Sequence, residues 1–101
     1  MPRLIITDKA SAGLENCRLF LAENNPTALI KAADTIEHYL FLLENEPIIG
    51  RPLDDEPDLR ELIIPFGDSG YIALYHFDLD KNNILILAFR HQKEVGYREI
   101  A

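Results

Sequence analysis

Two amphipathic segments separated only by Asn24-Asn25-Pro26 constrain this chain more than any other feature. In both segments, apolar residues recur at spacings of three and four, which places them on one face of a helix. The first stripe consists of Ala10, Leu14, Cys17 and Leu21, and the second of Leu29, Ala33, Ile36, Leu40 and Leu43, widened by Phe41. Asparagine ends helices well and proline is tolerated at the first helical position, so the second helix is expected from Pro26 to about Asn45. Such a short connection predicts an antiparallel two-helix hairpin.

A short strand is predicted before this hairpin. Residues 3–7 are rich in β-branched side chains and leucine, as strands usually are. We expect the first helix to begin directly afterwards, with Asp8 or Ser11 as its N-cap. Short side chains that carry an oxygen atom accept hydrogen bonds from the free N–H groups at a helix start.

Three further strands are predicted in the second half of the chain. A loop rich in proline, glycine and acidic residues is expected from about Glu46 to Asp58. The strands follow at 59–66, 71–77 and 84–89, separated by short turns that force neighbouring strands to be antiparallel. The sequence therefore predicts an α+β fold, in which an N-terminal strand and a two-helix hairpin precede a three-stranded antiparallel meander.

Length and composition limit the organisation and location of the protein. The 101 residues leave room for one domain, which we assign to residues 1–101. No apolar run approaches the roughly 18 residues that a membrane-spanning helix requires, and the N-terminus lacks the apolar core of a signal peptide. Cys17 is the only cysteine, so no internal disulfide can form. These features predict a cytoplasmic protein that does not associate with a membrane.

The formal net charge of −7 argues against one class of function. Proteins that bind nucleic acid through its phosphates usually carry a basic face, and their affinity depends on the number of phosphates they neutralise. Here 17 acidic residues outnumber 10 basic ones. Tight binding to free DNA or RNA is therefore not expected.

No pattern in the sequence indicates a metal or cofactor site. The acidic residues Asp54-Asp55-Glu56 and Asp58 lie in the predicted loop, where consecutive side chains point in different directions. The segment 78–83 begins like a calcium-binding loop, but Asn83 stands where glycine is needed and Phe89 where glutamate is needed. The three histidines lack the spacing of zinc ligands, and there is no glycine-rich phosphate loop. We therefore expect no cofactor and no bound metal.

One segment combines several groups that are useful for chemistry: Arg90-His91-Gln92-Lys93-Glu94-Val95-Gly96-Tyr97, directly after the last predicted strand. Together with Arg60 and Arg51 it offers cations for phosphate neutralisation, an imidazole for proton transfer and an aromatic ring for base stacking. A segment without a chemical role, made of a charged strand end and a tail, would have the same composition. From the residues alone, both interpretations stay open.

At these residues the chain resembles the RelE/ParE superfamily, the toxins of type II toxin–antitoxin, or plasmid stabilisation, systems. The resemblance rests on four stretches in order: Gly50-Arg51-Pro52-Leu53, Leu59-Arg60-Glu61-Leu62, Tyr71-Ile72-Ala73-Leu74-Tyr75 and the ending Arg90 to Tyr97. The predicted order of a strand, two helices and three strands is also that of the superfamily. The likeness covers nearly the whole chain and implies the same fold.

The resemblance implies a cognate antitoxin as partner, which lays a partly disordered segment across the toxin. Because this toxin is acidic, we expect apolar anchors in the contact, or basic antitoxin residues that meet the acids of residues 54–58. Two mechanisms are implied. RelE-like toxins cleave messenger RNA in the ribosomal A site through attack of a 2′-hydroxyl on the adjacent phosphate, without a metal. ParE-like toxins poison DNA gyrase by protein–protein contact.

Carried over to this chain, the RelE-like mechanism implies Arg60 and Arg90 as phosphate ligands. His91 or Tyr97 would transfer protons, and Tyr97 would stack on a base. Ile72 departs from that pattern, because RelE-like toxins often have an arginine directly after the tyrosine that opens this strand. This departure and the negative net charge favour the ParE-like action on gyrase. The alternatives are a ribosome-dependent mRNA endoribonuclease and a non-toxic relative that only binds an antitoxin.

Overall fold

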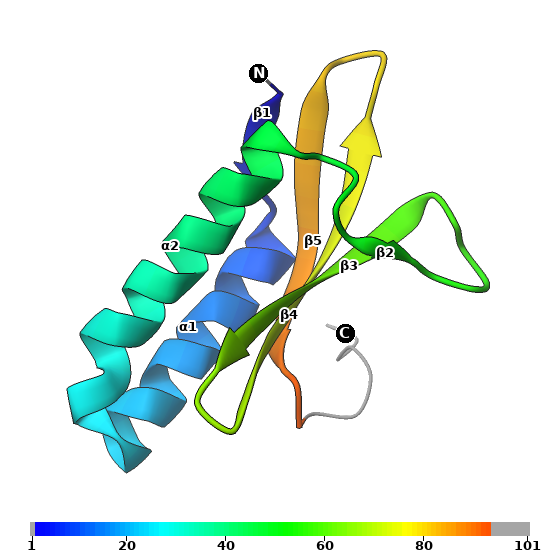
Figure 1. The fold of residues 1–101 in the computed structure, drawn as a ribbon. Coiled ribbons are helices and arrows are strands. Elements are labelled where there is room, and N and C mark those ends of the chain that lie inside the picture. Colours follow the sequence, from blue (N-terminus) through cyan, green and yellow to red (C-terminus); the bar gives the residue numbers. More distant parts are fainter. Residues whose placement is uncertain (1, 94–101) are drawn as a thin grey trace.

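A five-stranded sheet and two helices make up residues 2–93, the part of the chain that the computed structural model describes (Figure 1). β1 (Arg3–Ile6) leads into α1 (Asp8–Asn24), and a short 3-10 helix, η1 (Pro26–Ala28), connects α1 to α2 (Leu29–Asn45). The remaining elements are β2 (Arg51–Pro52), β3 (Leu59–Phe66), β4 (Ser69–Asp78) and β5 (Asn83–His91). Both helices cover the same face of the sheet.

The strand order in the sheet is β1-β5-β4-β3-β2. The meander of β3, β4 and β5 is antiparallel, as predicted. The predicted strand count and order are wrong in two respects. β1 joins the sheet parallel to β5, with Leu4 opposite Ile84, and thereby covers an open edge of β5. β2 lies inside the predicted loop and pairs antiparallel with β3; with two residues, one of them Pro52, it is too short to show an alternating pattern.

The first helix begins with a different cap from the predicted one. Thr7 has an extended backbone, and its side-chain oxygen accepts a hydrogen bond from the N–H of Ala10 at 3.3 Å. Asp8 is already helical, and the N–H of Ser11 donates to the backbone carbonyl of Thr7, so both predicted caps are wrong. The Thr7 hydroxyl also donates to the carbonyl of Ile86 at 2.7 Å, which fixes the helix start to β5.

The hydrophobic core lies between the helices and the sheet. Alternate side chains of β3, β4 and β5 point toward the helices, because successive strand residues face opposite sides of a sheet. The largest fully buried side chains are Tyr75, Leu43, Ile64, Ile84 and Ile86. Cys17 of α1 is 8% exposed and belongs to the same cluster, so it has the buried position that the helix stripe predicts.

The two helices lie over different strands. α1 contacts β5, and a Cβ on Gly13 of α1 would come within 2.1 Å of the carbonyl oxygen of Phe89, so this approach requires glycine. α2 contacts β3. Because β4 lies between β3 and β5 in the sheet, the helices leave a space between them above β4. No helix within residues 2–93 is both long and apolar enough to cross a membrane.

Candidate functional site

Three of the four predicted site residues lie on strands of the sheet. Arg60 lies on β3, and Arg90 and His91 are the last two residues of β5. Tyr97 lies outside the described residues. Within residues 2–93, no group of three or more histidine, cysteine, aspartate or glutamate side chains is arranged to hold a metal ion.

Arg60 is bound to the loop that follows α2. Its Nη1 donates to the carbonyl oxygens of Gly50 at 2.7 Å and Ile48 at 3.2 Å. Arginine provides donors in a fixed planar arrangement, so two carbonyl partners fix both the position and the orientation of the guanidinium. Arg60 therefore has a structural role here, which the resemblance does not imply.

Tyr75 holds the same loop from the core side. Its hydroxyl donates to the carbonyl of Pro47 at 2.8 Å and accepts the N–H of Gly50 at 2.9 Å. A Cβ on Gly50 would lie 2.6 Å from both the Tyr75 ring and its hydroxyl oxygen, so the close approach requires glycine at this position. Burial raises the pKa of Tyr75 above its ordinary value. Local structure thus accounts for Gly50. The next residue, Arg51, forms an ion pair with Glu61 of β3 at 3.1 Å.

Arg90 and His91 are directed to opposite sides of the sheet, because they are consecutive residues of one strand. His91 is opposite Tyr71 on β4, and its ring meets the edge of the Tyr71 ring at a centroid distance of 5.6 Å, on the side of the helices. Arg90 is opposite Ile72, on the other side. The two side chains therefore leave the backbone on opposite faces of the sheet, although Arg90 Nη1 donates to the backbone carbonyl of His91 at 3.3 Å.

The hydrogen bonds of His91 determine which of its ring nitrogens carries the proton. Nδ1 accepts the backbone N–H of Lys93 at 3.1 Å, so Nδ1 must be unprotonated. The proton is then on Nε2, which donates to the hydroxyl oxygen of Ser69 at 3.0 Å. Ser69 therefore accepts a hydrogen bond from His91. A serine nucleophile that is activated by a histidine base would instead donate its hydroxyl proton to the histidine. His91 would have to give up the Lys93 contact before it could accept a proton at Nδ1.

Arg60 is also remote from His91. Arg60 pairs with Tyr75 and His91 pairs with Tyr71, so their partners are four residues apart along β4. At about 3.4 Å per residue this is roughly 14 Å, and the two side chains lie on strands on either side of β4. The residues predicted to act together are not brought together within the described part of the chain.

A cavity of about 560 Å³ lies beside His91, at the C-terminal end of α1. Phe20 lines it with an exposed ring, whose centroid is 6.5 Å from that of His91. Three asparagines and Ser69 add polar groups. Of the described residues that line it, only Lys93 is a cation, so the cavity offers stacking surface but little charge for a phosphate.

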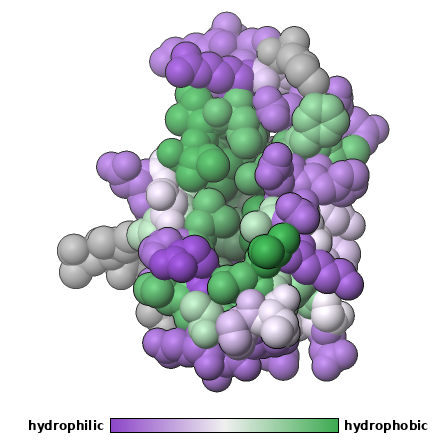
Figure 2. All heavy atoms as spheres, turned by 90° about the vertical axis from the view of Figure 1, so that its left-hand side faces the viewer, coloured by the Kyte–Doolittle hydropathy of each residue, from purple (hydrophilic) through white to green (hydrophobic). Residues whose placement is uncertain are grey.

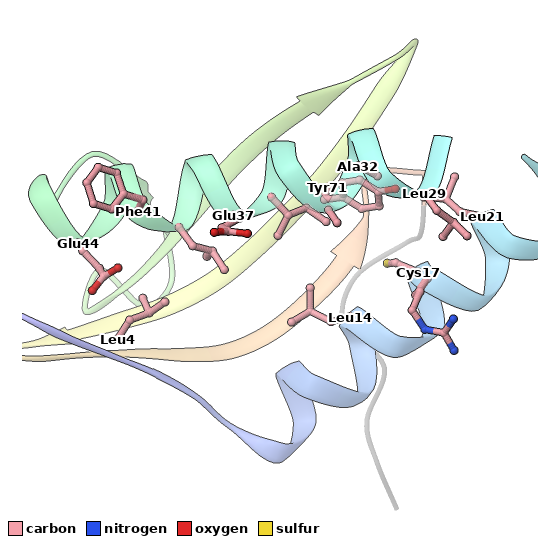
Figure 3. Close-up of a pocket in the computed structure, with 14 residues that line it drawn as sticks. Leu4, Leu14, Cys17, Leu21, Leu29, Ala32, Glu37, Phe41, Glu44 and Tyr71 are labelled. Atoms are coloured by element: carbon pink, nitrogen blue, oxygen red, sulfur yellow. The ribbon is translucent and has the colours of Figure 1, made fainter. Parts of the chain in front are cut away.

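An apolar groove with a volume of about 460 Å³ lies between α1 and α2 (Figure 3). Tyr71 and Leu4 of the sheet contribute to its floor, and its walls are apolar side chains of the two helices: Leu14, Cys17, Leu21, Leu29, Ala32, Ala33, Ile36, Leu40 and Phe41. Figure 2 shows it as an apolar band between hydrophilic rims. We name this surface the interhelical groove. The predicted hairpin is present, but its apolar stripes only partly cover each other.

The charged residues that line the interhelical groove differ between its two sides. Glu37 and Glu44 of α2 line one side and extend over the groove in Figure 3. Arg18 of α1 lines the other side and is paired with Glu15, with Nη2 and Oε1 2.6 Å apart. The hydrogen bond from Arg18 lowers the pKa of Glu15. Sequence reasoning missed this rim, although the helical period already places Glu37 and Glu44, seven residues apart, on one face.

A comparison with protein-family models identifies the family of this chain. A family model described as the ParE toxin of the type II toxin–antitoxin system, parDE, matches residues 4–96. A search among curated proteins gave no match. The match spans both helices and all of the sheet except Arg3, and it includes the motifs around Gly50, Arg60 and Tyr71. The chain therefore belongs to the ParE toxin family of type II toxin–antitoxin systems.

Proposed function

We propose that this toxin acts on DNA gyrase by protein–protein contact, in the cytoplasm, and that a cognate antitoxin neutralises it. The observation that supports this target most is that the residues predicted to act in a nuclease lie apart from one another. Cleavage of a phosphodiester needs cations and a proton-transfer group around one phosphate. Here Arg60 is bound to loop carbonyls, and Arg90 and His91 face opposite sides of the sheet.

The net charge of −7 supports the same target. Contact with a protein does not require a basic face, whereas a toxin that grips RNA through phosphates does. The acidic surface is thus consistent with a protein target and leaves few cations for a nucleic acid.

One observation favours ribosome-dependent mRNA cleavage as the second candidate. The cavity beside His91 combines an imidazole with the exposed ring of Phe20, and such a ring can stack on a base. The proton-transfer and stacking roles of Tyr97 belong to the same candidate and stay predictions.

The target can be determined by two assays made side by side on cells in which the toxin is induced. Gel analysis detects gyrase cleavage complexes and loss of supercoiling, and primer extension detects cuts in messenger RNA. We expect cleavage complexes together with intact mRNA. Cuts at A-site codons with unaffected gyrase would establish the nuclease instead, and the absence of both effects would indicate a non-toxic relative.

A further inference from the structure

The cavity beside His91 is lined along α1 by an aromatic ring between two amide groups. Asn16, Phe20 and Asn24 are spaced by four residues and all line this cavity. Residues four apart lie on one face of a helix, roughly 6 Å from each other. The Phe20 ring is 60% exposed, and the amides offer hydrogen-bond donors and acceptors without charge. This row of side chains therefore combines a flat apolar surface with neutral polar groups at both of its ends.

The distance between the two rings in this cavity suits a flat ligand. The ring centroids of Phe20 and His91 are 6.5 Å apart, and the ring planes are inclined by 43°. Carbon atoms in contact lie about 3.5–4 Å apart, so a planar ring held between two others separates them by roughly 7–8 Å. An exposed side chain such as that of Phe20 changes rotamer within nanoseconds. A flat heterocycle can thus enter between the two rings after a small movement of Phe20.

The charges around the cavity favour a ligand without charge. Among the lining residues within the described part of the chain, Asp68 is the only acid and Lys93 the only base, so their charges cancel. The imidazole of His91 is neutral, because its Nδ1 accepts the N–H of Lys93. Sites that stack the bases of a nucleic-acid strand combine their aromatic rings with a positively charged groove. The balanced charge here, on a molecule with a net charge of −7, favours a single uncharged molecule over a strand.

The amide groups and the size of the cavity favour a purine. An asparagine amide forms two hydrogen bonds with adenine, at N6 and N7. Asn16 has no side-chain hydrogen bond to another residue of the described part of the chain, so both of its polar atoms can meet a ligand. Nδ2 of Asn24 donates to the carbonyl of Phe20 at 2.9 Å, which leaves Oδ1 as an acceptor. The volume of about 560 Å³ lies within the range of about 300–1,000 Å³ that small-molecule sites have.

We propose that the cavity beside His91 binds an uncharged purine nucleoside, whose base lies between Phe20 and His91 with its polar edge on Asn16 and Asn24. Asp68 lines the same cavity and can accept hydrogen bonds from the ribose hydroxyls, as an acidic residue does in dinucleotide-binding folds. The site is distinct from the contact with gyrase proposed above, and no bond of the nucleoside is made or broken. The same base also occurs in RNA, so the test includes a strand.

The test titrates isotope-labelled full-length toxin with adenosine, cytidine, adenosine monophosphate and the adenine trinucleotide, followed by two-dimensional NMR. We expect adenosine to shift the backbone signals of residues that line the cavity and to leave those of loop 54–58 unchanged. Cytidine has a smaller ring and should bind more weakly, and the two phosphorylated ligands should bind no more tightly than adenosine.

Four results of this titration would overturn the proposal. The first is the absence of shifts at adenosine concentrations up to about 10 mM. The second is a set of shifts confined to residues outside the cavity, and the third is tighter binding of cytidine than of adenosine. The fourth is tighter binding of a phosphorylated ligand by more than about threefold, which for the trinucleotide would assign the cavity to an RNA-binding surface.

α2 provides a matched control, because Phe41 and Asn45 repeat the pair of Phe20 and Asn24 outside this cavity. Phe41 is 59% exposed, and Nδ2 of Asn45 donates to its carbonyl at 3.0 Å. We expect Phe20→Ala to weaken adenosine binding at least about tenfold through the loss of stacking, and Phe41→Ala to leave it unchanged. Asn24→Leu should weaken it about threefold or more through the loss of an acceptor, and Asn45→Leu should have no effect.

The paired variants keep the proposal falsifiable even if one of them is unstable. Circular dichroism shows whether each variant is folded, and the Asn24→Leu and Asn45→Leu pair decides the question if Phe20→Ala is not. Equal adenosine affinity within either folded pair would overturn the proposal. The gyrase and mRNA assays contain no added nucleoside, so a wrong target and a wrong ligand give different results.

Discussion

Gly50, Arg60 and Tyr75 act together on the backbone between α2 and β2. The guanidinium of Arg60 and the hydroxyl of Tyr75 both bind this backbone, and the absence of a side chain at Gly50 allows the Tyr75 ring to approach it. This arrangement explains why these residue types occur together in the stretches that carry the family resemblance. It also gives Arg60 a structural role in holding this loop.

Substitution of Tyr75 by phenylalanine should destabilise the protein by about 1–3 kcal/mol, because the buried N–H of Gly50 and the carbonyl of Pro47 lose their partner. Urea unfolding followed by circular dichroism measures this change. Tyr39→Phe is the matched control, since its hydroxyl has no hydrogen-bond partner within residues 2–93. A Tyr75→Phe variant as stable as the Tyr39→Phe variant would show that water replaces the lost contacts.

The stability of the protein should fall at alkaline pH through the buried tyrosines. Burial raises the pKa of both Tyr71 and Tyr75, so the folded state keeps their protons at pH values where the unfolded chain loses them. This contribution is complete below the unfolded pKa of about 10 and is lost as the pH rises from there through the folded pKa. Unfolding measured between pH 8 and about 11 should show a smaller loss for Tyr75→Phe than for the wild type. Parallel curves would contradict the assignment.

At the scale of the elements, local sequence patterns correctly predicted the helices and strands that short-range interactions determine. Helical periodicity gave both helices, and the turn residues gave the antiparallel meander. The pairing of β1 with β5 joins distant parts of the chain, and no pattern within either segment encodes it. The two residues of β2 are too few to carry a signal. The interhelical groove depends on how far apart α1 and α2 lie, which the apolar stripes do not specify.

The start of α1 offers a test of how one side chain couples two elements. Thr7→Ala removes the cap on the N–H of Ala10 and the hydrogen bond to Ile86, and should cost about 1–2 kcal/mol in the free energy of unfolding. Ser11→Ala, at a cap position that the sequence suggested, should change stability by less than about 0.5 kcal/mol. Thermal or urea unfolding of the two variants checks this difference. A larger loss for Ser11→Ala than for Thr7→Ala would contradict the observed cap.

At the scale of the whole molecule, the sequence indicated the family, the fold class and the acidic surface, but not the arrangement of the site. The predicted last strand ends at residue 89, whereas β5 continues through His91. This extension matters because strand alternation then sends Arg90 and His91 to opposite faces. Arg60 could not be assigned to the loop from the sequence, because its partners are backbone carbonyls, which no residue pattern reveals.

The division of these residues between two faces leads to a prediction about toxicity. Arg90→Ala and His91→Ala should each still arrest growth, because the proposed contact with gyrase needs neither proton transfer nor a cation on a phosphate. The measurement is growth after induction, with the amount of soluble toxin compared by immunoblot, and antitoxin co-purification shows that each variant is folded. If both variants lose toxicity at normal levels and the wild type cuts mRNA, the nuclease mechanism is correct. A substrate would then have to bring the two faces of the sheet to one phosphate, by a rearrangement of the end of β5 that first breaks the contact between His91 and Lys93.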